Sequence, residues 1–252
     1  MDTPYPSTSG LRKPHVTKLA TSMSKLRQLI KKTPLYQPLN SLRSDLTRWK
    51  WRCLGCTLPP PPEVKHATIK DYAKRFGLSV LVETGTYSGS TIAATRNQFA
   101  EIYSIELSPE FHKCAKERFA DDPKIHLLLG DSGIVLREIL LTMNRTALFW
   151  LDAHYSGGST ARGAIDTPIV QELDTILTLR PNSVVLIDDA RCFDGSNSYP
   201  TLAELSQYVR DKAPHWIFTV KHDIIRLHYI LAKDICKLSR RKFFHCIDEV
   251  QS

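Results

Sequence analysis

Carboxylate side chains follow two of the apolar, strand-like segments in the second half of the chain. Asp152 comes directly after residues 147–151, and Asp188 and Asp189 come directly after residues 183–187. If both segments belong to one parallel sheet, their carboxyl ends meet at the same edge and the three carboxylates converge. Converging carboxylates repel one another unless a cation neutralises them, and oxygen ligands suit a hard ion such as Mg²⁺. The pattern therefore predicts a magnesium site.

His154 stands two residues after Asp152 and is suited to moving a proton there. A bound metal would orient substrate hydroxyl groups and lower the pKa of one of them. His154 is then the candidate general base or an additional ligand, and together with Asp152 it forms the candidate catalytic set. Two simpler interpretations stay open: Asp188 and Asp189 cap the segment that follows them, or Asp189 pairs with Arg191.

A glycine-containing segment lies between the first predicted strand and the helix after it. Its sequence includes Glu83, Thr84, Gly85, Thr86, Gly89 and Ser90. Because glycine has no Cβ, the backbone can approach a bound nucleoside closely at these positions. Ligands of doubly wound sheets bind at the carboxyl ends of the strands, where this segment lies. An ordinary strand-to-helix turn is the alternative explanation for two glycines at this spacing.

Two further strand ends carry acids that suit the same kind of ligand. Glu106 ends the second predicted strand, 21 residues after Gly85, near the spacing at which an acid accepts hydrogen bonds from ribose hydroxyls. Asp131 and Ser132 follow the third predicted strand, directly after Gly130. Each could be a solvated strand end or a simple turn, but together with the glycine segment they favour a nucleoside-binding edge.

These residues are positioned by helices and short apolar strands that alternate from about residue 66 onward. Strands are predicted at residues 79–83, 102–106, 125–129, 147–151, 183–187, 216–220 and 225–231. Helical segments between most of them imply a mainly parallel sheet that is covered on both faces. Only a short polar link separates the last two strands, which predicts an antiparallel hairpin. We therefore expect a doubly wound, Rossmann-like α/β fold with seven strands.

The motifs resemble those of the class I S-adenosylmethionine-dependent methyltransferases, over about residues 66 to 231. The resemblance implies that the segment from Gly85 to Gly89 holds the methionine part of the cofactor, Glu106 its ribose, and Asp131 with Ser132 its adenine side. The expected cofactor-binding residues are Glu83, Gly85, Thr86, Gly89, Ser90, Glu106, Asp131 and Ser132. An NAD cofactor is disfavoured because the G-x-G-x-x-G fingerprint is absent.

The acidic residues extend this resemblance to the metal-dependent sugar O-methyltransferases of the macrocin and mycinamicin type. Those enzymes also have a Glu-Thr-Gly motif, an Asp after strand four and an Asp-Asp pair after strand five. By this likeness Asp152, Asp188 and Asp189 are the metal ligands. Where those enzymes have an Asp-Gly-Asp type of segment, this chain has Asp152, Ala153 and His154. The resemblance implies O-methylation of a hydroxylated small molecule or sugar.

The net charge of +8 comes almost entirely from the first quarter of the chain. Residues 1–62 contain 11 Lys and Arg residues but only two acids, and the rest is nearly neutral. We interpret residues 1–62 as a basic arm with a disordered start, an amphipathic helix at residues 16–30 and a proline spacer, and residues 63–252 as the catalytic domain. A nucleic-acid enzyme would also carry positive charge around its cleft, so we expect no nucleic-acid substrate.

The arm leaves several partners open. Its helix can lie on an anionic membrane surface, dock on the neighbouring domain or join two copies of the chain. No apolar run reaches the roughly 18 residues of a membrane span. Six cysteines without a leader-like segment favour reduced thiols and a cytoplasmic location, peripheral to a membrane if the arm binds one, and Cys53 and Cys56 lack a second pair for zinc. A non-catalytic cofactor-binding or scaffold protein on the same fold is the alternative function.

Overall fold

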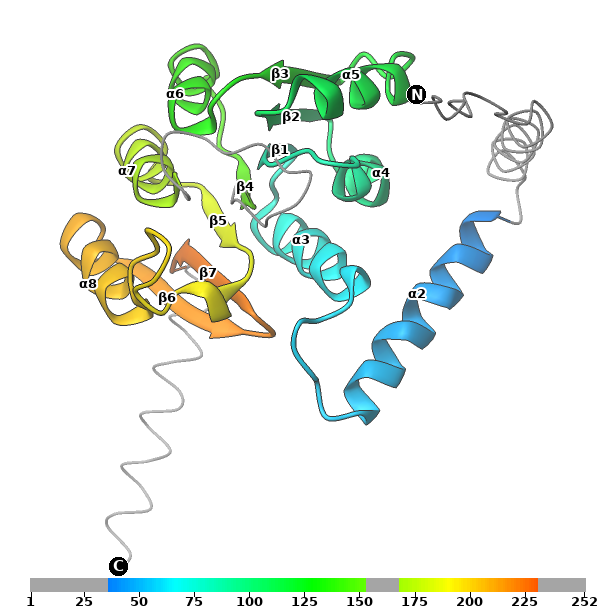
Figure 1. The fold of residues 1–252 in the computed structure, drawn as a ribbon, viewed down its shortest axis with the longest axis horizontal. Helices are drawn as coiled ribbons and strands as arrows, with labels where there is room; N and C mark the ends of the chain where they lie inside the picture. Colours follow the sequence, from blue (N-terminus) through cyan, green and yellow to red (C-terminus); the bar gives the residue numbers. More distant parts are fainter. Residues whose placement is uncertain (1–35, 153–167, 231–252) are drawn as a thin grey trace, which may run out of the picture. The chain divides into compact units, whose positions relative to one another are not determined.

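The computed structural model describes residues 36–152 and 168–230, with side chains from residue 41 onward. The chain divides into two compact units, residues 1–53 and 54–252. The described part of the first unit is one helix, α2 (Tyr36–Cys53), which the sequence analysis did not predict (Figure 1). The helix expected at residues 16–30 lies outside the described residues. No described helix is both long enough and apolar enough to cross a membrane.

The second unit is built on a seven-stranded sheet with the order β3-β2-β1-β4-β5-β7-β6 (Figure 1). The first five strands pair in parallel, whereas β7 runs antiparallel to both β5 and β6. The predicted doubly wound sheet with its closing hairpin is therefore confirmed. The strands are β1 (Val80–Thr84), β2 (Glu101–Glu106), β3 (Ile125–Leu129), β4 (Leu148–Leu151), β5 (Val184–Ile187), β6 (Trp216–Lys221) and β7 (Ile224–Tyr229).

Helices cover both faces of this sheet (Figure 1). One face packs on α3 (Pro62–Phe76), α4 (Ser90–Thr95) and α5 (Pro109–Arg118), and the other on α6 (Ser132–Thr142), α7 (Ile169–Leu179) and α8 (Leu202–Lys212). Two 3₁₀ helices, η1 (Arg96–Gln98) and η2 (Ala190–Cys192), complete the described elements. Successive β1 residues alternate between the two cores: Val80 and Val82 face α6, and Leu81 faces α3. Apolar residues on both sides of a strand are typical of a covered parallel sheet.

The local sequence explains where the helices next to the sheet edge begin and end. Gly77 ends α3 in the left-handed conformation, with φ of 65°. Ser108 and Asp131 each accept a hydrogen bond from a backbone N–H in the first turn of α5 and α6. Because α4, α5 and α6 start within a few residues of the ends of β1, β2 and β3, their N-termini gather at the carboxyl edge of the sheet.

Candidate active site at the carboxyl edge of the sheet

The glycine segment forms a tight loop between β1 and α4. Gly85 and Gly89 have φ angles of 86° and 66°, and Tyr87 between them also has a positive φ, 46°. The Gly85 N–H donates to the Ile105 carbonyl of β2 at 2.9 Å. A Cβ at Gly89 would lie only 2.6 Å from the Phe119 ring. Both glycines are therefore required by the backbone path of the loop, whatever the loop binds.

Glu106 holds this loop to the turn after β2. One carboxylate oxygen accepts the Tyr87 N–H at 2.7 Å and the other accepts the Ser108 N–H at 2.8 Å. The side chain is largely buried, with Glu106 7% exposed. Each carboxylate oxygen can accept two hydrogen bonds, so both retain a further lone pair. Glu106 thus lies at the carboxyl end of β2 and shapes the loop.

Glu83 and Thr86 take part in a buried hydrogen-bond chain next to the loop. Ser104 of β2 donates to the Glu83 carboxylate at 2.6 Å, and its hydroxyl lies 2.7 Å from that of Thr86. Burial raises the pKa of Glu83 to about 7, although hydrogen bonds from Ser104 and Thr91 act in the opposite direction. A carboxyl group with this pKa is largely protonated in mildly acidic solution. The chain joins β1, β2 and the start of the loop.

Asp131 and Ser132 begin α6 directly after β3. The Asp131 carboxylate accepts the Gly133 N–H at 2.9 Å, so one of its oxygens serves the helix N-terminus. Ser132 is buried, and Glu172 of α7 beside it is 1% exposed. Burial raises the pKa of Glu172 to about 7, while hydrogen bonds from Ser132 and Thr84 lower it. Glu172 was not expected from the sequence, because one acid within an apolar helix gives no spacing signal.

The three predicted metal ligands do converge. One carboxylate oxygen from each of Asp152, Asp188 and Asp189 lies within 4.8 Å of the others. Within residues 36–152 and 168–230, these three form the one group of acidic, His or Cys side chains close enough to bind an ion together. Asp188 and Asp189 are buried, and Asp152 is half-buried. Cys53 and Cys56 are free thiols and belong to no such group among the described residues.

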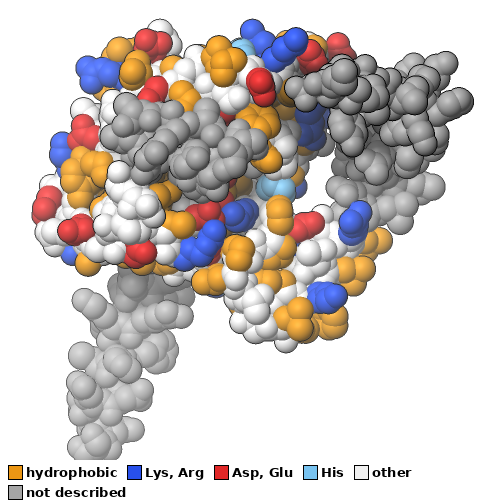
Figure 2. Space-filling view, viewed as in Figure 1, with side chains coloured by type: hydrophobic (Ala, Val, Ile, Leu, Met, Phe, Trp, Pro, Cys, Tyr) orange, Lys and Arg blue, Asp and Glu red, His pale blue; other side chains and the backbone are white. Residues whose placement is uncertain are grey.

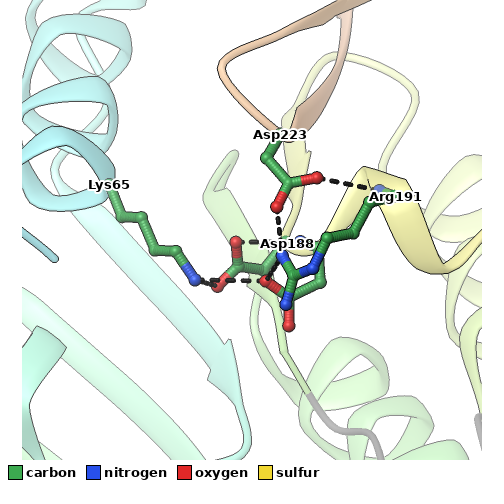
Figure 3. A network of polar contacts seen from close by, with 5 residues as sticks. Lys65, Asp188, Arg191 and Asp223 are labelled. Atoms are coloured by element: carbon green, nitrogen blue, oxygen red, sulfur yellow. Dashed lines mark hydrogen bonds and ion pairs between the residues drawn. The ribbon is translucent and has the colours of Figure 1, made fainter. Parts of the chain in front are cut away.

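Lys65 of α3 reaches into this acidic cluster (Figure 3). Its Nζ lies 2.5 Å from Asp188 Oδ2 and 3.2 Å from Asp189 Oδ1. Burial and the neighbouring Asp189 raise the pKa of Asp188 to about 6, and Lys65 opposes this shift. Burial lowers the pKa of Lys65, but the carboxylates of Asp188, Asp189 and Asp152 outweigh it and raise that pKa overall. Lys65 was not expected from the sequence, because it precedes Asp188 by 123 positions in a helix with no recognisable motif.

Arg191 and Asp223 complete the network on the side of the hairpin (Figure 3). Arg191 Nη1 donates to Asp189 Oδ1 at 2.8 Å and also pairs with the Asp223 carboxylate. Asp223, in the β6–β7 turn, accepts the Arg191 N–H at 2.8 Å. The alternative interpretation of an Asp189–Arg191 pair is thus correct, and it coexists with the acidic cluster. Asp189 is the N-cap residue of η2, but its side chain makes no capping hydrogen bond there, whereas Asp188 Oδ1 accepts the Asp189 N–H at 2.9 Å.

The donor set suits a hard divalent cation. Carboxylate oxygens are the ligands that Mg²⁺ prefers, and an ion about 2.1 Å from each oxygen requires oxygens no more than roughly 4.2 Å apart. The observed cluster needs only small side-chain shifts to meet this limit. The ammonium group of Lys65 already contacts two of the three carboxylates, so an ion would have to share them with it or displace it. His154, the candidate base, lies outside the described residues.

Comparison with known proteins identifies the fold. No protein-family model and no curated protein sequence matches the chain. Among solved structures, an O-methyltransferase from Bacillus cereus in complex with SAH has a TM-score of 0.52 and 11% identity, covering 82% of this chain and 97% of that one. The O-methyltransferase TomG from Streptomyces achromogenes in complex with SAM has a TM-score of 0.49 and 17% identity, covering 75% and 89%.

A third similar structure is an SAH-bound methyltransferase from Podospora anserina, with a TM-score of 0.46 and 16% identity over 90% of this chain and 100% of that one. Identities this low concern the fold alone. The superposition on the Bacillus cereus structure and the sheet order agree: the chain has the class I S-adenosylmethionine-dependent methyltransferase fold.

Proposed function

We propose that this chain is an S-adenosylmethionine-dependent O-methyltransferase that modifies a hydroxylated small molecule or sugar with the help of a divalent metal. One observation carries the proposal: the acidic cluster and the glycine loop are joined directly. The Asp152 N–H donates to the Thr84 carbonyl at 3.1 Å and approaches the Thr84 hydroxyl at 3.3 Å. Thr84 is the residue before Gly85, so the metal-type ligands and the cofactor-type loop form one continuous edge.

The cofactor part of the proposal rests on the loop and on Glu106. The backbone from Gly85 to Gly89 would hold the methionine part, and the remaining lone pairs of Glu106 would accept the ribose hydroxyls. Asp131 and Ser132 would lie on the adenine side. The Bacillus cereus enzyme, whose fold is shared, is bound to SAH. This supports the same cofactor here.

The chemistry follows from placing a hydroxyl group beside the three carboxylates. Bound by Asp152, Asp188 and Asp189, Mg²⁺ would supply positive charge that lowers the pKa of the hydroxyl. S-adenosylmethionine would supply the methyl group: the hydroxyl oxygen would bond to the methyl carbon as the carbon–sulfur bond breaks, which would give a methyl ether and S-adenosylhomocysteine. His154 is proposed to take the hydroxyl proton. Arg191 orients Asp189 through their ion pair.

The surface charge favours a small-molecule or sugar acceptor over a nucleic acid. On the face drawn in Figure 2, acidic and basic side chains are interspersed over the described residues of the second unit, 54–152 and 168–230. A nucleic-acid substrate would favour a continuous basic surface around the site. The likeness to the macrocin and mycinamicin type suggests a sugar hydroxyl, and we include this in the proposal.

A second candidate is a cofactor-binding protein without turnover on the same fold. The ion pair between Lys65 and Asp188 favours it, because the chain itself supplies a cation that neutralises part of the acidic cluster. The three acids can then persist without a metal. Binding of S-adenosylmethionine with no methyl transfer to any of a panel of sugars, polyketides and phenols would establish this candidate.

Substitution of the acids tests the first proposal. Asp152→Asn, Asp188→Asn and Asp189→Asn each remove a charge that an amide cannot replace, so we expect strongly reduced Mg²⁺ or Mn²⁺ affinity with cofactor affinity retained. His154→Ala should keep metal binding and lower turnover by roughly 10²- to 10⁴-fold. Calorimetry and transfer of a labelled methyl group measure these effects. Transfer at the full rate in excess EDTA would contradict metal assistance.

A further inference from the structure

We propose that Lys65 is a resident cation of the acidic cluster and competes with the divalent metal for Asp188 and Asp189. This inference rests on the proposed metal site and adds the group that regulates its occupancy. Lys65 comes from α3 and contacts both acids that follow β5 (Figure 3). Lys65 and a divalent metal ion would therefore bind the same two aspartates.

The position of Lys65 is well defined by its helix. Pro61 and Pro62 begin α3, and Val64, next to Lys65, is buried at 6% exposure. The Lys65 side chain is 20% exposed, and that of Asp188 only 1%. An ion pair of a flexible surface lysine stabilises a protein little, because the side chain loses conformational entropy when it forms. The partly buried Lys65 side chain loses less entropy on pairing, so its ion pair is more stabilising.

The acidic cluster gathers several carboxylates around two basic side chains. Asp188 and Asp189 contact Lys65, and Asp189 and Asp223 contact Arg191. Asp152 converges with Asp188 and Asp189, so the site offers three carboxylates to a divalent ion. An ion on the same Asp188 oxygen would lie close to the ammonium group, and like charges at that separation repel strongly in a partly buried site. Metal binding consequently has to displace the Lys65 head group from Asp188.

Metal titration of Lys65→Met tests this competition directly. Methionine keeps much of the length and apolar stem and removes the charge, so Mn²⁺ affinity measured by calorimetry on the full chain should rise by about 10-fold or more. Lys65→Arg keeps a cation and should bind Mn²⁺ no more tightly than the parent chain. Lys74→Met is the matched control, because it removes the same charge from an exposed position of α3 and should leave Mn²⁺ affinity unchanged.

The outcomes separate this inference from the proposed function. Equal Mn²⁺ affinity in Lys65→Met and the parent chain would overturn the competition and leave the metal site in place. No Mn²⁺ binding to either would overturn both the metal site and the competition, and cofactor titration would show whether the methyltransferase assignment survives. If Lys65→Met is destabilised by its unpaired Asp188, the Tm increase on adding Mn²⁺ should exceed that of the parent chain. An equal or smaller increase would also count against the inference.

An independent feature of α2 suggests a second binding surface. Leu42, Leu46, Trp49 and Cys53 recur at intervals of four, three and four residues and so form one stripe along the helix. This stripe is exposed: Leu42, Leu46 and Trp49 are 59%, 65% and 64% exposed. The buried or half-buried positions, Ser44, Thr47, Arg48 and Trp51, lie on the opposite face. The apolar stripe of α2 is therefore exposed.

We further propose that this stripe binds an anionic lipid surface. Arg43 and Lys50 border it on one side and Arg52 on the other, and all three are exposed. Figure 2 shows Lys or Arg side chains beside hydrophobic ones over this helix. On an anionic lipid surface, the basic residues would contact the headgroups, and the apolar stripe with its Trp would insert beside the acyl chains. Residues 1–35 contain seven Lys and Arg residues and one acid, so they also carry positive charge that is complementary to anionic headgroups.

Vesicle binding by the full chain tests the surface. We expect binding to phosphatidylcholine vesicles that contain phosphatidylserine and little binding to phosphatidylcholine alone, with a decrease at high salt. Leu42→Ser with Leu46→Ser should weaken binding by about 10-fold or more, because apolar insertion is lost. Ile134→Ser with Leu141→Ser is the control: these residues are 60% and 64% exposed on α6, and their replacement should have no effect.

Trp49 supplies a direct signal of insertion. Of the four tryptophans, Trp51, Trp150 and Trp216 are at most 8% exposed, so a blue shift of fluorescence on adding vesicles should come from Trp49. Trp49→Phe should keep the binding and abolish the shift. Unchanged vesicle binding in the double Leu variant would overturn the proposal, since charge alone would then suffice. Absence of lipid binding together with a dimer that the double Leu variant disrupts would instead assign the stripe to a second copy of the chain.

Discussion

Glu106 connects the glycine loop and the turn after β2 through a single carboxylate. Its two oxygens accept the N–H groups of Tyr87 and Ser108, at 2.7 and 2.8 Å. The proposed ribose contact would use the remaining lone pairs of the same oxygens. Loss of this side chain therefore affects the loop and the ligand together.

We expect Glu106→Ala to weaken S-adenosylmethionine binding by about 1 to 3 kcal/mol, the range for charge-assisted hydrogen bonds. Glu106→Gln should cost less, because its amide oxygen still accepts one of the two N–H groups. Isothermal calorimetry measures both changes, and the melting temperature reports on the loop. Equal cofactor affinity in the Ala variant and the parent chain would remove Glu106 from the proposed ribose site.

Glu83 and Glu172 are buried carboxyl groups on two sides of the site, and they predict a pH dependence of stability. Burial raises the pKa of each from 4.5 to about 7 in the folded chain. The folded state then holds protons that the unfolded state has released, so the free energy of unfolding falls as pH rises from about 4.5 to about 7. Glu172→Gln should flatten part of this decrease in urea unfolding at several pH values. A profile identical to that of the parent chain would contradict a protonated Glu172.

At the scale of elements, the loop between β1 and α4 depends on Gly89 for two separate reasons. Its φ of 66° suits glycine, and a Cβ would lie 2.6 Å from Phe119. Gly77, at the end of α3, has a similar φ of 65° but open space around its Cβ position. An alanine at Gly77 would therefore introduce backbone strain alone, whereas an alanine at Gly89 would add a steric overlap to the same strain.

We expect Gly77→Ala to lower the free energy of unfolding by about 1 kcal/mol, the usual cost of a left-handed alanine. Gly89→Ala should lower it by about 2 to 4 kcal/mol, because the Phe119 contact adds an overpacking cost. Denaturant unfolding measures both variants. Equal losses at the two positions would mean that Phe119 moves aside freely.

At the scale of the whole molecule, the chain separates into residues 1–53 and residues 54–252. All seven strands and both hydrophobic cores lie in the second unit. Deleting residues 1–53 should therefore leave cooperative unfolding and S-adenosylmethionine binding intact, while the proposed lipid binding is lost. Calorimetric unfolding of the truncated chain measures the first effect. Loss of a cooperative transition would show that the first unit is part of the folded core.

The sequence alone predicted the mainly parallel sheet, the closing hairpin and the convergence of three carboxylates at one edge. Short apolar runs alternating with helical spacing are local patterns, and parallel strands separated by helices bring their carboxyl ends to one edge. For this reason Asp152 and the pair after β5 were correctly expected to converge. The hairpin was also readable, because only Lys221, His222 and Asp223 separate its two strand patterns.

Only the tertiary structure decided which other groups meet the acids. Lys65, Asp223 and Glu172 are brought to the site by helix packing and by the hairpin, and no local pattern encodes those contacts. The exposure of the α2 stripe is likewise visible only in the folded chain. Periodicity identifies an apolar face, but only packing decides what covers it. Sequence spacing predicts which residues meet at the ends of neighbouring strands. Contacts between a helix and the sheet depend instead on how the two layers pack, which no local pattern shows.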